Sequence, residues 1–187
     1  MVDNILKDAT SQTFLGVRIA QYWSDLLLWE KFFNEELHPY TTIIELGTGN
    51  GAMSMYLNIQ ARSRGMVFAS YDVRVSTISQ VSRLPSQLGF DAIVGNVFDD
   101  KTVDFVKKLI DKHGETPFVI FGDNGNKPME WKVYGPLLRP GDFFVVHDWN
   151  TEFKAEDIPE AGRKIEFVME ELCEETDSLT RWMRILE

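Results

Sequence analysis

The chain contains 187 residues, of which 44% are apolar, and its 29 acidic and 19 basic residues give a formal net charge of −10. This length predicts one domain with a full hydrophobic core, and the apolar content argues against intrinsic disorder. The acidic balance argues against a general nucleic-acid binder, because contacts to phosphates need clustered Lys and Arg.

Cysteine content and the apolar pattern indicate where the protein works. Cys173 is the single cysteine of the sequence and cannot form an internal disulfide, which suits a reducing compartment. Residues 1–4 lack the basic start of a signal peptide, and no run reaches the roughly 20 apolar residues of a membrane span. We therefore expect a cytoplasmic protein that binds neither nucleic acid nor membrane.

The first predicted element is a helix over residues 17–37, preceded by polar residues 1–13 that we expect to be poorly ordered. Apolar residues recur in it at helical spacings: Ile19, Trp23, Leu26, Leu27, Trp29, Phe33 and Leu37. Their wide band predicts contacts on two sides, one of them with a sheet. Pro39 ends the helix, because the residue before a proline is disfavoured in helical conformation.

A glycine-rich turn follows the first predicted buried strand, residues 43–46. Gly47, Gly49 and Gly51 permit backbone angles closed to other residues and leave no Cβ in the way of a ligand. The next helix begins at Ala52 and turns its free N–H groups towards the turn, an arrangement that attracts anions. The spacing Gly47-x-Gly49-x-x-Ala52 is compatible with a dinucleotide-binding turn, and a tight turn that binds nothing is the other alternative.

The fuller pattern Glu45-x-Gly47-x-Gly49-x-Gly51 resembles motif I of the class I S-adenosylmethionine-dependent methyltransferases. In that motif the loop lies against the methionine part of the cofactor, and the acidic residue anchors the loop. The resemblance implies S-adenosylmethionine as the cofactor, with Glu45, the three glycines and Thr48 among its binding residues.

The ends of the next two predicted strands carry polar residues suited to a nucleoside. Residues 66–71 predict a strand that ends at Asp72, about 20 residues past the turn, where a carboxylate can accept both ribose hydroxyls. The alternative is that Asp72 caps a helix over residues 75–88, which Pro85 should shorten or kink. A third strand is predicted over residues 91–97.

Methyltransferases usually place a polar residue at the end of this third strand, beside the adenine. The resemblance therefore implies that Asn96 bonds the adenine edge, with Val97 and Phe98 packed on its face. Asp99 is expected to cap a helix over residues 101–112.

The fourth and fifth predicted strands, residues 118–121 and 143–146, are nearly continuous apolar runs. Asp123 follows the first of them, and His147 and Asp148 follow the second. In open α/β sheets, ligands bind in the crevice at the carboxyl ends of the strands, which is where these side chains should lie. A helix over residues 128–138 connects the two strands.

The remaining chain predicts a loop over residues 151–159, a helix over 160–175 and a last strand over 179–186. The helix has four apolar residues on one face: Ile165, Val168, Met169 and Leu172. Alternation in the last strand predicts a half-covered edge.

The whole pattern predicts an α/β fold, a Rossmann-like doubly wound, mainly parallel sheet of about six strands with helices on both faces. We expect a single methyltransferase-like domain over residues 1–187, with an N-terminal helical cap (1–40) and a Rossmann-like core (41–187).

Three pieces of the sequence resemble the cephalosporin hydroxylase/rhamnosyl O-methyltransferase family of class I methyltransferases: residues 16–21, residues 43–49, and Asp123 with the pair His147-Asp148. Members of that family typically hold a divalent ion with an Asp after strand four and an acidic pair after strand five. The resemblance therefore implies a metal site of Asp123, His147 and Asp148. His147 stands where the family usually has Glu. Three carboxylates suit magnesium, whereas an imidazole also accepts manganese, iron or zinc.

The resemblance thus predicts a metal-assisted O-methyltransferase that acts on a small-molecule hydroxyl, with His147 and Asp123 as candidate catalytic residues. A bound ion would lower the pKa of the hydroxyl and fix its position, and His147 is either the third ligand or a general base. One alternative is a metal-independent methyltransferase with His147 as base. Another is an NAD-binding oxidoreductase or a non-catalytic nucleotide-binding protein. Family members often form homo-oligomers, so we expect a dimer or a higher assembly.

Overall fold

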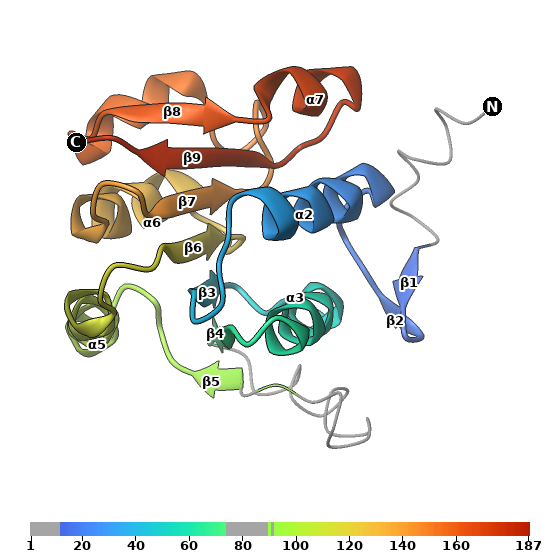
Figure 1. Cartoon of the computed structure of the whole chain (residues 1–187), viewed down its shortest axis with the longest axis horizontal. Coiled ribbons are helices and arrows are strands. Elements are labelled where there is room, and N and C mark those ends of the chain that lie inside the picture. Colours follow the sequence, from blue (N-terminus) through green and yellow to red (C-terminus); the bar gives the residue numbers. More distant parts are fainter. Residues whose placement is uncertain (1–11, 74–89, 91) are drawn as a thin grey trace.

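The computed structural model describes residues 12–73, 90 and 92–187, and its centre is a seven-stranded sheet (Figure 1). The strand order is β5-β4-β3-β6-β7-β9-β8. The strands are β3 (Thr42–Leu46), β4 (Val67–Asp72), β5 (Ala92–Val94), β6 (Phe118–Gly122), β7 (Phe143–Val146), β8 (Ile165–Val168) and β9 (Arg181–Ile185). Neighbours pair in parallel from β5 to β7, whereas β9 is antiparallel to both β7 and β8. The predicted doubly wound, mainly parallel α/β fold is confirmed.

Helices cover both faces of the sheet. They are α2 (Trp23–Glu35), α3 (Ala52–Ser63), α5 (Asp100–Lys112), α6 (Lys127–Tyr134) and α7 (Glu170–Glu175), with 3₁₀ turns η2 (Gly135–Leu137) and η3 (Ala155–Ala161). Side chains of α2 and α3 share one buried cluster with one face of the central strands, and side chains of α5 and α6 share a second cluster with the other face.

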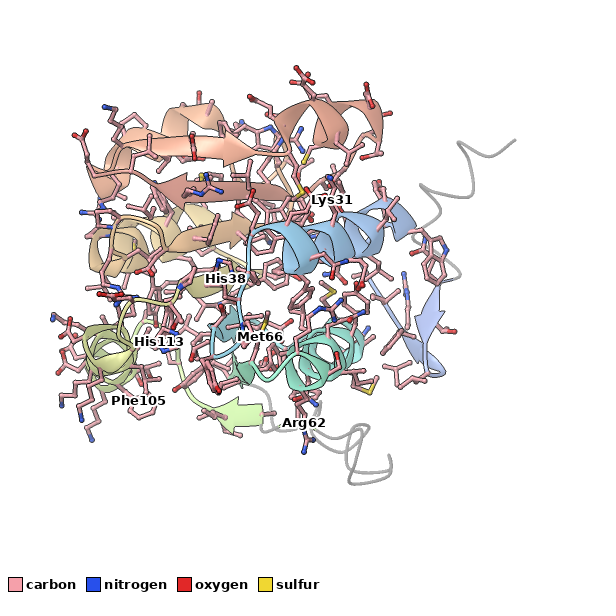
Figure 2. All side chains as sticks on the ribbon, in the orientation of Figure 1. Lys31, His38, Arg62, Met66, Phe105 and His113 are labelled. Carbon is pink, nitrogen blue, oxygen red and sulfur yellow. The ribbon has the colours of Figure 1, made fainter. Side chains whose placement is uncertain are left out.

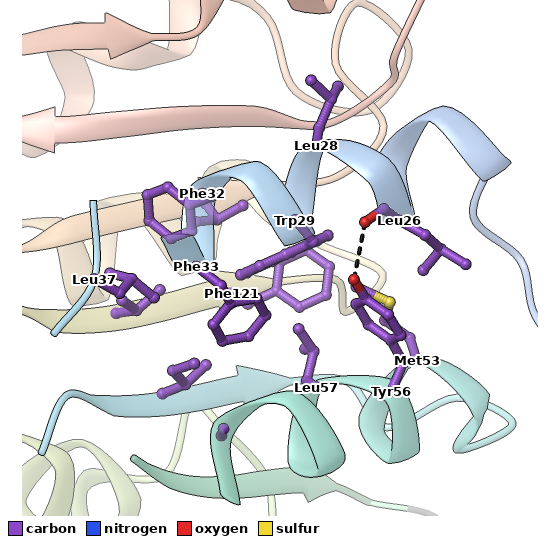
Figure 3. Close-up of a cluster of buried hydrophobic side chains, with 14 of the residues drawn as sticks. Leu26, Leu28, Trp29, Phe32, Phe33, Leu37, Met53, Tyr56, Leu57 and Phe121 are labelled. Carbon is purple, nitrogen blue, oxygen red and sulfur yellow. Dashed lines mark hydrogen bonds between the residues drawn. The ribbon is translucent and has the colours of Figure 1, made fainter. Parts of the chain in front are cut away.

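The cluster under α2 is built mainly from aromatic rings. The Trp29 ring lies 5.1 Å from that of Phe121 on β6 and 5.6 Å from that of Trp182 on β9, both in edge-to-face geometry. The hydroxyl of Tyr56 on α3 donates a hydrogen bond of 2.9 Å to the Leu26 carbonyl, so the two helices are also tied directly (Figure 3). Edge-to-face pairs add stability beyond their buried area and hold α2 in one orientation on the sheet.

Helix α5 shows how an amphipathic helix is oriented on the opposite face. Val106 and Ile110 are fully buried against the sheet, whereas Phe105 points away from it and is exposed (Figure 2). At the end of the helix, the His113 ring lies 3.3 Å from the Thr42 hydroxyl, measured from Nδ1 to Oγ1. Burial lowers the pKa of His113 more than the nearby charges change it.

The N-terminal prediction is wrong about where the first helix begins. Residues 13–18 form a hairpin of β1 (Thr13–Phe14) and β2 (Val17–Arg18), and α2 begins only at Trp23. The first six residues of the predicted helix are therefore strand β2 and the segment that joins it to α2. The hairpin lies on the side of the sheet to which β6 and β7 point (Figure 1). Apolar spacing alone could not separate this hairpin from the helix that follows it.

The C-terminal prediction is also wrong. Residues 160–175 do not form one helix, because Ile165–Val168 is strand β8 and α7 begins after it. Met169 between them has φ of 60°, which interrupts a helix. Strand β8 pairs along the outer side of β9, so β9 is not an edge and both faces of it are covered. The sheet therefore has seven strands rather than about six.

Several smaller boundaries also differ. Residues 155–161 of the predicted loop form η3, and the predicted helix over 128–138 becomes α6 followed by η2. Asp99 is the residue before α5, which the structure describes in full, but its side chain makes no capping hydrogen bond to that helix. The predicted helix over residues 75–88 and most of the N-terminal segment lie outside the described residues. Within the described residues, no helix has the length and apolar character needed to cross a membrane.

Candidate active site

The turn after β3 depends on the glycine at its first position. Gly47 has φ of +105°, and a Cβ there would lie 2.5 Å from the carbonyl oxygen of Asp123, closer than atoms can approach. Its N–H donates a 2.8 Å hydrogen bond to the Tyr71 carbonyl. Gly51, with φ of 81°, is the residue immediately before α3. The chain can therefore turn from β3 into α3 while packing against the end of β6.

A hollow of about 160 Å³ lies between this turn and the segment that follows the β1–β2 hairpin. Thr48, Gly49 and Met53 line one side of the hollow, and Arg18 and Gln21 line another. Gly51 and Ala52, at the start of α3, also line the hollow, and a Cβ on Gly49 would meet no atom of the described residues beyond its chain neighbours within 4 Å. The hollow therefore combines a helix N-terminus with room for a ligand, which fits the methionine part of the predicted cofactor.

Glu45 lies beneath the hollow and is fully buried. Its Oε2 accepts hydrogen bonds from the hydroxyls of Ser54 and Ser70, and the Ser70 hydroxyl also lies 2.6 Å from that of Thr48. Burial raises the pKa of Glu45 to about 8, although the two serine hydrogen bonds oppose this shift. At neutral pH the Glu45 side chain is thus mostly a neutral acid that ties β3 to α3 and β4.

The remaining predicted cofactor residues lie in two different surroundings. Asp72, at the end of β4, accepts a hydrogen bond of 3.0 Å from the Gly49 N–H through Oδ2, so it lies beside the glycine turn. Asn96 instead makes a local turn, in which Oδ1 accepts from the Phe98 N–H and Nδ2 donates to Asp99. Val97 is buried in the core on the α5 side. Asn96 and Val97 do not line the hollow, and their role in adenine binding stays a prediction.

Asp123, His147 and Asp148 meet at the ends of β6 and β7. The two strands are paired neighbours, so their carboxyl ends lie together. The Nδ1 of His147 is 3.3 Å from Asp123 Oδ1 and 3.3 Å from Asp148 Oδ1. One ligand atom from each residue lies within 4.8 Å of the other two. Asp148 has φ of 58°, a left-handed backbone conformation.

This separation fits one divalent ion. Ligand atoms that surround an ion at about 2.1 Å lie at most about 4.2 Å apart, so small movements of the three side chains would enclose it. Two carboxylates and an imidazole form a donor set that accepts magnesium, manganese, iron or zinc. The described part of the chain brings together the predicted metal-binding residues, while the identity of the ion stays open.

The charges of this cluster are strongly coupled. Burial alone would lower the pKa of His147, but the carboxylates of Asp123, Asp148 and Asp25 outweigh it and raise the value to about 10. Burial also works against ionised Asp148, but His147 and Lys127 outweigh it and hold the pKa of Asp148 well below its usual range. Without a bound ion, His147 is therefore protonated at neutral pH and Asp148 is ionised.

Three residues of this site were missed by the sequence analysis. Gln21 donates a 2.7 Å hydrogen bond through Nε2 to Asp123 Oδ2. Asp25 on α2 lies behind His147, with 3.9 Å between its Oδ2 and Nε2 of His147, and accepts a hydrogen bond from Ser178. Lys127 is buried among the carboxylates. Its place four residues after Asp123 is a signal that the sequence does contain, whereas nothing in the sequence pairs Gln21 or Asp25 with this site.

The strand order, the glycine turn and the hollow beside it define a class I S-adenosylmethionine-dependent methyltransferase. A family model described as Rhamnosyl O-methyltransferase/CmcI matches residues 7–164, and the chain belongs to this family. The resemblance seen in the sequence is confirmed, as is the conclusion that the protein is a methyltransferase. A comparison with curated protein sequences finds no significant match.

Solved structures similar to this chain include several methyltransferases. A structure titled as CmcI with SAH has a TM-score of 0.63 and 17% identity over 95% of this chain and 84% of that chain. One titled as CmcI with Mg and SAM has a TM-score of 0.66 and 16% identity, over 97% and 79%. The O-methyltransferase TomG from Streptomyces achromogenes, in complex with SAM, has a TM-score of 0.53 and 16% identity, over 90% and 82%. Identities this low show a common fold.

Proposed function

We propose that this protein transfers the methyl group of S-adenosylmethionine to a hydroxyl oxygen of a small molecule, with a divalent ion held by Asp123, His147 and Asp148. The observation that carries the proposal is the position of Asp123. Its side chain belongs to the cluster of possible metal ligands, and the same residue lines the hollow beside the glycine turn. A methyl donor in the hollow and an acceptor at the cluster would therefore be neighbours.

The protein residues have distinct tasks in this reaction. The glycine turn and the N-terminus of α3 hold the methionine part of the donor, and Asp72 binds the ribose. The sulfonium methyl carbon is already electrophilic, so catalysis consists mainly of placing the acceptor oxygen in line with it and excluding water. The new C–O bond forms as the C–S bond breaks, and S-adenosylhomocysteine leaves. Asp123, the carboxylate of the cluster that also lines the hollow, is placed to take the proton of the hydroxyl.

The ion would supply positive charge that lowers the pKa of the acceptor hydroxyl. CmcI, whose fold is similar, has a structure titled with Mg and SAM, which supports the use of a divalent ion together with this donor. The three donor atoms of this chain lie close enough together to share one ion. Because one of them is an imidazole nitrogen, we expect manganese, iron or zinc to be accepted as well as magnesium.

A metal-independent reaction with His147 as general base has less support. A base must be unprotonated at the working pH, and the surrounding carboxylates raise the pKa of His147 to about 10. His147 is also buried, which leaves little room for an acceptor hydroxyl next to its ring. Membership of a methyltransferase family argues against the alternative of an NAD-binding oxidoreductase.

The acceptor is a small molecule in this proposal, consistent with the net charge of −10, which disfavours nucleic acid. We also propose a cytoplasmic protein and a homo-oligomer, because the hollow is open and a second copy could cover it. Analytical ultracentrifugation tests the oligomer directly, since a monomer at micromolar concentration would contradict it.

The main experiment measures transfer of a labelled methyl group from S-adenosylmethionine to a panel of phenols and sugars. We expect EDTA to abolish transfer, and we expect added magnesium or manganese to restore it. Calorimetry with S-adenosylhomocysteine and with NAD tests the donor separately. Full turnover in EDTA would contradict the metal-assisted reaction, and binding of NAD alone would contradict the donor.

A further inference from the structure

Lys127 places an ammonium group inside the carboxylate cluster. Its Nζ lies 2.8 Å from Asp148 Oδ2, 2.8 Å from Glu152 Oε2 and 3.8 Å from Asp123 Oδ1, and it donates a 3.0 Å hydrogen bond to the Asn124 carbonyl. Only 3% of the side chain is exposed. The residue is therefore a fixed, buried cation whose partners include two of the three possible metal ligands.

The position of Lys127 in its helix is electrostatically unfavourable. It is the first residue of α6, where the free N–H groups already carry partial positive charge. A buried lysine is stable there only because carboxylates surround its Nζ. The cluster thus contains the Lys127 ammonium as a cation even without a bound metal ion.

A divalent ion beside His147 would bind the same two carboxylates that Lys127 now contacts: Asp123 through Oδ1, and Asp148 through Oδ1 while Lys127 contacts its Oδ2. Two cations that share these two carboxylates would repel each other strongly at separations of a few ångströms. We propose that Lys127 is a built-in competitor of the divalent ion, and that the ion binds only when this side chain leaves Asp123 and Asp148. The inference rests on the proposed metal site and concerns how that site is loaded.

Glu152 can hold the Lys127 ammonium group when it leaves Asp123 and Asp148. Its side chain is 53% exposed, so it lies at the outer rim of the cluster, and its Oε2 is already 2.8 Å from Nζ. The long and flexible lysine stem allows Nζ to remain paired with Glu152 while it moves away from the strand ends. Lys127 would therefore keep one carboxylate partner while the divalent ion replaces it at Asp123 and Asp148, so no buried charge is left alone.

The first test measures Mn²⁺ binding directly, from the electron paramagnetic resonance signal of free Mn²⁺, so that activity plays no part. We expect Lys127→Met to bind Mn²⁺ at least about tenfold more tightly than the wild type, because a competing charge is gone. Lys127→Arg keeps the charge and should remain close to the wild type. Lys132→Met is the matched control, because Lys132 is on the same helix and pairs with exposed Glu160. Equal affinity of Lys127→Met and wild type would overturn the inference.

A second test uses the wild-type protein and so does not depend on the folding of a variant. Acetylation of lysine amines is measured by mass spectrometry with and without saturating Mn²⁺. We expect labelling of Lys127 to rise when Mn²⁺ is added, while labelling of Lys132 stays constant. Labelling of Lys127 that Mn²⁺ leaves unchanged or reduces would overturn the inference.

The outcomes separate this inference from the proposed function. Equal Mn²⁺ binding by wild type and Lys127→Met would support the metal site and contradict the role of Lys127 as a competitor. Binding by Lys127→Met alone supports the competitor and contradicts a metal-assisted wild-type enzyme. If neither protein binds Mn²⁺ while both bind S-adenosylhomocysteine, the proposed metal site and the competitor role of Lys127 are both contradicted. The proposed methyl donor is then still supported.

Discussion

The glycine turn and the carboxylate cluster lie side by side at one edge of the sheet, yet they are constructed in different ways. The turn is one continuous stretch, residues 47–51, whose form depends on backbone angles open to glycine. The cluster gathers side chains from distant segments: Gln21 and Asp123, which are hydrogen-bonded, are 102 positions apart, and Asp25 and Ser178 are 153 apart. The turn is thus specified by shape and the cluster by balanced charge. Substitutions should disturb the turn through volume and the cluster through charge.

Gly47→Ala should have the largest effect, because Gly47 lies where the glycine turn contacts Asp123 of the carboxylate cluster. The new methyl group would lie against the Asp123 carbonyl, at a φ angle that is already unfavourable for alanine. We expect the free energy of unfolding to fall by about 3 kcal/mol, with loss of both S-adenosylhomocysteine binding and methyl transfer. Urea unfolding and calorimetry measure these effects.

Gly114→Ala is the control for this substitution. Gly114 also has a positive φ, +75°, but no atom lies within 4 Å of its missing Cβ. It should cost only about 1 kcal/mol and leave cofactor binding intact. Similar losses for the two variants would mean that φ alone, and not the contact with Asp123, explains the effect.

Asp148→Asn should separate charge from shape in the cluster. Asparagine has nearly the same size and tolerates the left-handed conformation of this residue, so the fold should survive. Loss of the carboxylate should lower methyl transfer at least about a hundredfold, while S-adenosylhomocysteine still binds as in the wild type. Asp111→Asn, at an exposed pair with Lys107, is the control. Weakened cofactor binding in Asp148→Asn would show that the two regions cannot be separated.

Glu45→Gln should show that the glycine side contains a charge-dependent element of its own. Burial raises the pKa of Glu45 from 4.5 to about 8, so the folded protein keeps a proton that the unfolded chain releases between these values. Stability from this group is present at low pH and declines as the pH rises through that window. From pH 5 to pH 7 the wild type should lose about 2 kcal/mol more of its unfolding free energy than Glu45→Gln does. Urea unfolding at several pH values measures this, and parallel curves would contradict it.

Asp72→Ala should have the smallest effect and confine it to the cofactor. The substitution removes the acceptor of the Gly49 N–H and the predicted ribose ligand. We expect S-adenosylhomocysteine to bind about tenfold more weakly, with little change in methyl transfer at saturating donor. Calorimetry and donor-dependent kinetics distinguish the two quantities. A fall in the rate at saturating donor with unchanged S-adenosylhomocysteine binding would show that Asp72 acts in the reaction and not in cofactor binding.

The sequence was informative wherever neighbours along the chain decide the structure. Strands that end at Leu46, Asp72 and Val146 follow from apolar runs, and the parallel pairing of β6 and β7 then explains why Asp123 and His147 meet. The helix over 160–175 was wrong because Met169 takes a left-handed angle that spacing does not reveal. The pairing of β8 with β9 depends on tertiary contacts, which also overrode the apolar pattern of the first helix.

The cluster was predicted only in part, for the same physical reason. Its three possible ligands stand at strand ends, where the fold alone brings them together. Its charge balance depends on Gln21, Asp25 and Lys127, whose side chains reach it from other segments. The direction of a side chain and the degree of its burial cannot be derived from spacing along the chain. The pKa of His147 is raised by its contacts with Asp123, Asp148 and Asp25, and the distances of those contacts do not follow from spacing along the chain.

The hydrogen bond from Ser178 to Asp25 has a consequence for the order in which the protein is completed during synthesis. Asp25 is among the earliest described residues and is fully buried, and its partner hydroxyl is made 153 positions later. A nascent chain that has not reached Ser178 can already fold the glycine turn, because that turn needs only nearby residues and the end of β6. It cannot yet supply the Ser178 hydroxyl, so among the described residues the Asp25 carboxylate behind His147 has only the Tyr22 N–H as a hydrogen-bond donor. Donor binding should therefore mature before the charge balance of the cluster, and a ribosome-bound intermediate should capture S-adenosylhomocysteine before it can transfer a methyl group.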